Sequence, residues 1–284
     1  MTDKKVPHEV IPCDKLPASR YRDLPEPPSS WTKLMGPSIL LLGLSIGSGE
    51  FVLWPYITYK FGFVVFWACM VGVLTQYFIN MEIERWTLAT GETAVTGFCR
   101  LWSGWAPIFL LCNIVPWVWP GWASGAATIL SWELGGGEGM RVFYSIASLI
   151  AIGLALSLGP VVYNTVERIQ TVLIGGVLLF LLVVFGLVVE VDHVLKMGRG
   201  IANVGHIPAE MELTLFLGAL AFAGAGGTMN LVQSDYVRDK GYAMGAYVSR
   251  LTSPLTGKEE VVDDIGYHFE PSDENMRRWR GWWK

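Results

Sequence analysis

Long uncharged stretches separated by short charged segments dominate the middle of this 284-residue chain. A membrane-spanning helix needs about 20 mainly apolar residues, and six stretches reach that length. They are residues 34–59 (interrupted only by Glu50), 61–81, 101–132, 142–166, 168–189 (without its leading Arg168) and 213–234. A helix satisfies its own backbone hydrogen bonds, as lipid requires. The pattern therefore predicts an all-α polytopic membrane protein with six spans.

Composition supports this division of the chain. Hydrophobic residues make up 52% of it and charged residues 16%, whereas soluble domains carry roughly 25% charged residues. The charges concentrate in residues 1–33 and 235–284. We expect residues 1–33, which are rich in proline, to be a disordered cytoplasmic arm. Residues 34–240 are then the six-span region, and residues 241–284 a cytoplasmic loop that leads to a span absent from this sequence.

The positions of Lys and Arg predict the orientation. Cytoplasmic loops are enriched in these residues, and 17 of the 21 lie on the N-terminal side of the membrane when six spans are counted. We therefore expect a multi-pass integral protein with a cytoplasmic N-terminus. Its setting is the lipid bilayer of a plasma membrane or a bacterial cytoplasmic membrane.

Several function classes find no support. The pI is about 5.6 and no basic stripe is present, so no nucleic-acid partner is expected. All four histidines lie outside the six stretches, which leaves the G-x-S-x-G match at Gly43–Gly47 without a partner. Zinc-protease and phosphate-loop motifs are also missing from the sequence. We expect neither an enzyme nor a bound cofactor.

Two of the six stretches carry a helix-breaking cluster near the centre. The clusters are Gly47-Ser48-Gly49-Glu50 in the first stretch and Gly224-Ala225-Gly226-Gly227-Thr228-Met229-Asn230 in the sixth. Irregular backbone at this depth is tolerated only where it is buried in protein or lines a cavity. Interrupted spans in corresponding positions of two repeats point to a transporter's binding site. We therefore expect spans one and six to be discontinuous and to share a site.

Glu50 indicates what this site binds. A carboxylate within a span costs at least about 2.5 kcal/mol on insertion scales and is a functional candidate by default. Carboxylate and backbone carbonyl oxygens are the ligands of hard cations. The candidate ligands of a divalent cation are therefore Glu50, the backbone around Gly47, Ser48, Gly49 and Gly227, and the side chains of Thr228 and Asn230, with Met229 able to contribute after a shift in alignment.

Other polar residues are weaker candidates. Gln76 and Asn80 lie at i and i+4 of the second stretch and Asn113 lies in the third, where hydrogen bonding between helices is their expected role. Asp235 and Arg238 end the sixth stretch and could form a cytoplasmic gate, although a surface ion pair is the simpler interpretation. Glu84, at the end of the second stretch, is expected to be solvated.

The order and spacing of several short motifs resemble the natural resistance-associated macrophage protein (NRAMP) family of divalent-metal transporters. The motifs are Gly36-Pro37, Phe61-Gly62-Phe63, Gln76-Tyr77, Gly91-Glu92 and Asn230-Leu231, within residues 34–250. The resemblance implies a leucine-transporter-like inverted-repeat fold of the APC superfamily. In that family this region is the first repeat plus the first helix of the second, so the remaining spans lie outside this chain. By itself the chain is then expected not to transport.

The two breaks depart from the family. Where the family has Asp-Pro-Gly-Asn, this chain has Gly47, Ser48, Gly49 and Glu50; where it has Met-Pro-His-Asn, this chain has Gly227, Thr228, Met229 and Asn230. Losing the thioether while gaining oxygen ligands should weaken selection for manganese and iron over magnesium or calcium. The family's proton coupling depends on the replaced Asp and His, so Glu50 becomes the candidate proton site.

Three hypotheses follow from these residues. The first is secondary-active transport of a divalent cation by alternating access, with the proton as a candidate coupling ion. The second keeps the fold but assigns an amino acid or organic amine whose ammonium group pairs with Glu50. The third is a non-transporting membrane subunit, for which Glu50 would have no role.

Overall fold

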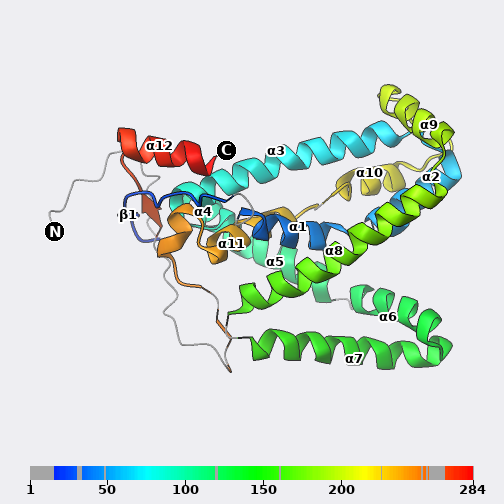
Figure 1. Ribbon diagram of the computed structural model, residues 1–284, viewed down its shortest axis with the longest axis horizontal. Coiled ribbons are helices and arrows are strands. Elements are labelled where there is room, and N and C mark those ends of the chain that lie inside the picture. The colour runs from blue at the N-terminus through cyan, green and yellow to red at the C-terminus, as the bar shows by residue number, and fades with distance from the viewer. Residues whose placement is uncertain are drawn as a thin grey trace.

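The computed structural model describes residues 16–30, 34–47, 49–118, 121–159, 161–224, 226–250, 252–253, 255 and 266–283. One candidate ligand, Ser48, lies outside them. Figure 1 shows long helices that run side by side and carry a small terminal module at one end. The helices are α1 (Gly36–Ser45), α2 (Trp54–Phe61), α3 (Phe66–Thr90), α4 (Ala94–Leu101), α5 (Trp105–Val118), α6 (Gly121–Leu134), α7 (Gly137–Leu158), α8 (Val162–Val188), α9 (Val191–Ala202), α10 (Leu213–Ala221), α11 (Met229–Lys240) and α12 (Asp273–Trp282), with a π-helical turn η2 (Gly49–Leu53), a 3-10 turn η3 (Ala243–Tyr247) and strands β1 (Arg20–Tyr21) and β2 (Tyr267–His268).

Among the residues that the structure describes, three helical stretches are long and apolar enough to cross a membrane. They are Trp105–Leu134, Gly137–Leu158 and Val162–Val188, and α1 with α2 adds a fourth if the pair is one bent span. Their large apolar side chains point outward, for example Leu182 and Leu187 of α8, which are 69% and 80% exposed. Such a surface suits lipid as its solvent. The chain is an all-α membrane protein.

The second and sixth predicted spans fall on less apolar helices. Gln76 and Asn80 lower the mean hydropathy of α3, which covers the second stretch and continues to Thr90. The sixth stretch is divided between α10, of nine residues, and α11. Neither is among the described helices that are long and apolar enough to span.

Both glycine clusters interrupt a helix. α1 ends at Ser45, and the helical segment that resumes at Gly49 is bent by 48° from it. α10 ends at Ala221 and α11 begins at Met229, with Gly224 and Gly227 between them at φ of +103° and +65°. This left-handed region is open to glycine at little cost and costs other residues strain.

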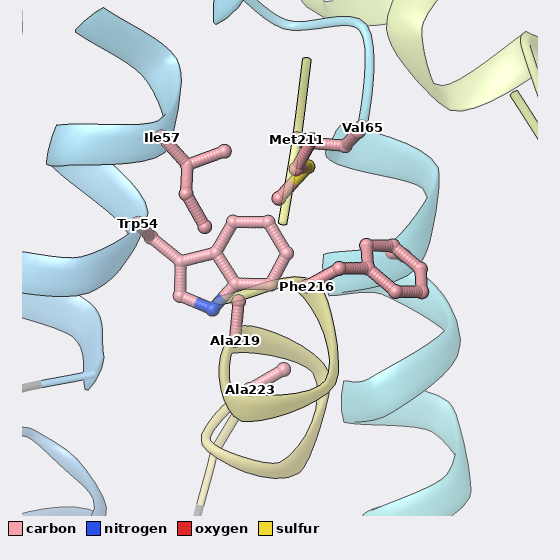
Figure 2. Packing of buried hydrophobic residues seen from close by; sticks show 8 residues of the cluster. Trp54, Ile57, Val65, Met211, Phe216, Ala219 and Ala223 are labelled. Atoms are coloured by element: carbon pink, nitrogen blue, oxygen red, sulfur yellow. The ribbon is translucent and has the colours of Figure 1, made fainter. Parts of the chain in front are cut away.

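A buried apolar cluster fixes α2 beside α10 and α3. Figure 2 shows Trp54 and Ile57 of α2 pointing toward Phe216 and Ala219 of α10. Val65, just before α3, and Met211, just before α10, close the cluster. These contacts hold the segments that follow the first break and precede the second break against one another.

The terminal module joins the two ends of the chain. The sequence predicts disorder for residues 1–33, but the described part of that arm pairs β1 in parallel with β2. Leu24 is fully buried, and its N–H donates to Asn275 Oδ1 of α12 over 3.0 Å. Proline-rich sequence can be ordered when another segment covers it, here the Arg- and Trp-rich α12.

A buried ion pair anchors this module to the helices. Arg100 of α4 donates from Nε to both carboxylate oxygens of Glu92, at 2.9 and 2.8 Å, and both side chains are about 5% exposed or less. Arg100 Nη2 also donates to the carbonyl of Pro17 over 3.0 Å. The fork geometry of Arg suits such a desolvated carboxylate.

Candidate functional site

The Glu50 carboxylate joins the two helix breaks. Glu50 Oε2 accepts the N–H of Gly47 over 3.1 Å, within the first break. Glu50 Oε1 accepts the N–H of Gly224 over 3.0 Å, within the second break and 174 residues away in sequence. One side chain therefore ties together the two interruptions that the sequence predicts to share a site.

Glycines allow the breaks to approach this closely. A Cβ on Gly49 would lie 2.7 Å from the carbonyl oxygen of Phe222 and 2.8 Å from its Cβ. On the α3 side, a Cβ on Gly72 would lie 2.6 Å from the Cβ of Ala223. Real side chains do not approach at such distances, so any larger residue would force the segments apart.

Gln76 supports the second break from α3. Its Nε2 donates to the carbonyl of Ala221, the last residue of α10, over 3.3 Å. That carbonyl belongs to a helix end, where backbone acceptors lack intrahelical partners. Gln76 therefore acts as a C-terminal cap for the broken helix, in keeping with its expected supporting role between helices.

The remaining predicted ligands lie at the start of α11. The carbonyl of Gly227 accepts from the N–H of Asn230 over 3.3 Å, and that of Thr228 accepts from Leu231 over 3.0 Å. Within the described residues, no hydrogen bond joins Glu50 to Thr228, Met229 or Asn230. The structure thus brings the first break to the second through the hydrogen bond of Glu50 to Gly224 and the close approach of Gly49 to Phe222. These contacts lie a few residues before the ligands predicted at the second break.

Two further predictions concern residues that stay local. Asn113 Nδ2 donates to the carbonyl of Phe109 one turn earlier in α5, over 2.9 Å. Arg238 pairs with Asp235 at 3.5 Å and with Asp239 at 3.0 Å, all within α11. These contacts stay within one helix, although Asp239 is buried, and none of them reaches Glu50.

Sequence reasoning missed a polar contact between α3 and α11. Glu84, for which the sequence predicts solvation, is half-buried and accepts a hydrogen bond from Gln233 Nε2. Gln233 is 1% exposed. The i, i+4 spacing of Gln76, Asn80 and Glu84 could have indicated this polar face of α3.

The chemistry available at Glu50 is that of an oxygen ligand. An ionised carboxylate offers about four acceptor positions, and the two N–H donors at the breaks use one on each oxygen. The other positions can face a cation. The described residues contain no group of three or more His, Cys, Asp or Glu side chains suited to a metal ion, so neutral oxygens would complete any such site.

No model of a protein family, no curated protein and no solved structure matches this chain.

Proposed function

We propose that the protein is a secondary-active transporter of divalent cations, NRAMP-like in fold, that binds its cargo between the breaks of spans one and six. Glu50 is the charged ligand, and backbone and side-chain oxygens from both breaks, with Asn230 and Thr228 foremost, are the neutral ones. These are hard donors, so the site suits Mg²⁺, Ca²⁺ and Mn²⁺.

The carboxylate of Glu50 bound to N–H groups of both breaks is the observation that carries this proposal. A cation or a proton on that carboxylate withdraws negative charge from its oxygens and so weakens the hydrogen bonds that they accept from the two N–H donors. Occupancy of the site therefore changes how tightly the two broken helices are held together. Alternating access requires such a link between the cargo and the relative position of the helices.

The distribution of polar residues on α3 supports a six-span arrangement. Leu74, Tyr77 and Phe78 are between 54% and 62% exposed, whereas Gln76 and Asn80 face the interior and are partly buried. An apolar exterior and a polar interior are what a helix within a membrane bundle requires. With α3, the bent α1–α2 pair and the α10–α11 pair, the proposed spans number six and the N-terminus is cytoplasmic.

Cation binding by the purified chain in lipid nanodiscs tests the proposal. We expect calorimetry to detect Mg²⁺ and Mn²⁺ binding that Glu50→Gln weakens by at least about tenfold, the loss that removing even an outer partner of a metal ligand causes. Glu133→Gln, in the exposed end of α6, is the matched control and should bind like the wild type.

Two results would redirect this account. Binding of methylammonium or an amino acid in a Glu50-dependent manner, without binding of either metal, would favour an organic-amine transporter. Binding of neither class would favour a non-transporting subunit. Uptake of the bound ion into proteoliposomes then distinguishes transport from binding alone.

A further inference from the structure

A row of polar side chains continues from the second break along α3. Gln76, Asn80 and Glu84 are spaced four residues apart and thus lie on one face of the helix. α3 packs against α11, and the apolar side chains of Tyr77, Phe78 and Ile79, between the first two of these polar residues, are exposed. The row begins at the end of α10 and extends away from the Glu50 site.

α11 places two buried amides opposite this row. Asn230 and Gln233 are 6% and 1% exposed and lie three residues apart on one face of α11. Gln233 Nε2 donates to Glu84 Oε1 and so connects the two helices. We call the five residues Gln76, Asn80, Glu84, Asn230 and Gln233 the polar seam.

Four amide oxygens of the polar seam lack a hydrogen-bond donor. Gln76 Oε1, Asn80 Oδ1, Asn230 Oδ1 and Gln233 Oε1 are buried, and no described group donates to them. For the two glutamines the amide orientation is fixed by their donor contacts, because turning either amide over would place its oxygen against Ala221 O or against Glu84 Oε1. Buried acceptors are normally satisfied, so these four oxygens are available to a cation or a hydrogen-bond donor.

We propose that the polar seam between α3 and α11 is a second binding site for a hard divalent cation, with Glu84 as its charged ligand. The amide oxygens of Asn80, Asn230 and Gln233 are its neutral ligands. An all-oxygen set with one carboxylate suits Mg²⁺ or Mn²⁺ rather than a thiophilic metal. This inference rests on the proposed function, because the seam would receive a cation leaving the Glu50 site.

Asn230 connects the two sites. It follows the second break directly. It is both a candidate ligand of the cation bound at Glu50 and a member of the polar seam. A cation that moves from Glu50 toward Glu84 would keep Asn230 as a shared ligand while it exchanges one carboxylate for the other. Such a shared ligand lowers the cost of desolvating the cation between sites.

Stoichiometry of Mn²⁺ binding tests the seam. The protein in nanodiscs is titrated with Mn²⁺, free Mn²⁺ is measured by electron paramagnetic resonance, and Mg²⁺ is used as the competitor. We expect two ions per chain in the wild type. The Glu84→Gln protein should still bind one ion, and adding Glu50→Gln to it should abolish binding of that ion. The Glu82→Gln protein should bind two ions. Glu82 lies on the same helix, 59% exposed, and pairs with Arg85 at the surface.

A second variant covers the case in which Glu84→Gln does not fold. Gln233→Met keeps the side-chain volume but removes the amide oxygen. We expect it to lower the affinity for one of the two ions by about tenfold. One ion per chain in the wild type, unchanged by Gln233→Met, would overturn the seam while leaving the Glu50 site intact. If the wild type binds one ion, and Glu84→Gln abolishes its binding while Glu50→Gln does not affect it, the seam is supported and the proposed function is contradicted.

Discussion

Two buried asparagines show how differently the terminal module and the long-helix region use polar side chains. Asn275 of α12 accepts from the N–H of Leu24 and donates to Asp23 Oδ1 and to the carbonyl of Glu270, at 3.0 to 3.1 Å. Asn230 is also buried, yet no group in the described part of the chain donates to its Oδ1. A satisfied amide stabilises a fold, whereas an unsatisfied one costs free energy that a ligand can recover. The terminal module is therefore a structural clamp, whereas the helical region holds a buried acceptor that the proposed cation sites would use.

The largest effect is expected where the clamp joins the helices. Arg100→Met leaves Glu92 as a buried charge without its partner, which costs about 3–5 kcal/mol of stability. Thermal unfolding in detergent measures this loss. The double variant Arg100→Met with Glu92→Met should recover most of it, because both charges are gone. A loss below about 1 kcal/mol for the single variant would contradict the clamp interpretation.

The two asparagines allow a matched comparison. Asn275→Leu leaves the N–H of Leu24 unsatisfied and should cost about 1–3 kcal/mol without affecting cation binding. Asn230→Leu removes an amide oxygen that is already unsatisfied, so it should cost less stability than Asn275→Leu while cation affinity falls. Unfolding and Mn²⁺ binding are measured on both proteins. Equal stability losses would remove the distinction between the two regions.

The close approach of the breaks gives a third prediction. Gly49→Ala places a Cβ against Phe222 O and should cost about 1–2 kcal/mol through overpacking, with weaker cation binding because the breaks separate. Gly218→Ala, in α10, is the control, since its Cβ would meet nothing within 4 Å. It should be neutral or stabilising. Unchanged cation affinity in Gly49→Ala would show that the contact with Phe222 does not position the site.

The smallest effect concerns pH and the surface of the clamp. Hydrogen bonding and charge from Arg277, and then from Arg278, hold the pKa of the Glu26 carboxyl below its usual value. A lowered folded-state pKa means that its contribution is present above the unfolded pKa and is lost as pH falls through the folded one. Tryptophan fluorescence of α12 should therefore report slightly weaker docking in acid. Glu26→Gln should remove that pH dependence; an identical profile in the variant would contradict it.

Much of the helical framework could be predicted from apolar runs alone. Residues 142–166 and 168–189 cover most of α7 and α8, because helices with exposed apolar surfaces carry continuous apolar sequence. The prediction divides the two helices at Glu167, whereas α7 ends at Leu158 and α8 begins at Val162. α3 extends nine residues beyond the predicted end at residue 81, since Glu82, Glu84 and Arg85 are good helix formers. Order around Leu24 was not predictable, because it depends on α12 far along the chain.

The candidate site was predictable in position but not in its contacts. The glycine clusters in the sequence locate both breaks. The carboxylate of Glu50, within the first cluster, identifies the charged residue of the site. That Glu50 binds the N–H of Gly224 depends on tertiary packing across 174 residues, which no local pattern contains. Glu84 was missed because its charged neighbours suggest a solvated helix end, while the four-residue spacing to Asn80 turns it toward α11.

Anomalous diffraction from crystals of the protein grown with Mn²⁺ tests the central claim most directly. The account predicts an anomalous peak at coordination distance from the Glu50 carboxylate, between the first break and the start of α11, that is absent in Glu50→Gln. Mn²⁺ bound only at sites remote from both breaks, or no ordered Mn²⁺ in the wild type, would contradict a divalent-cation site built on Glu50.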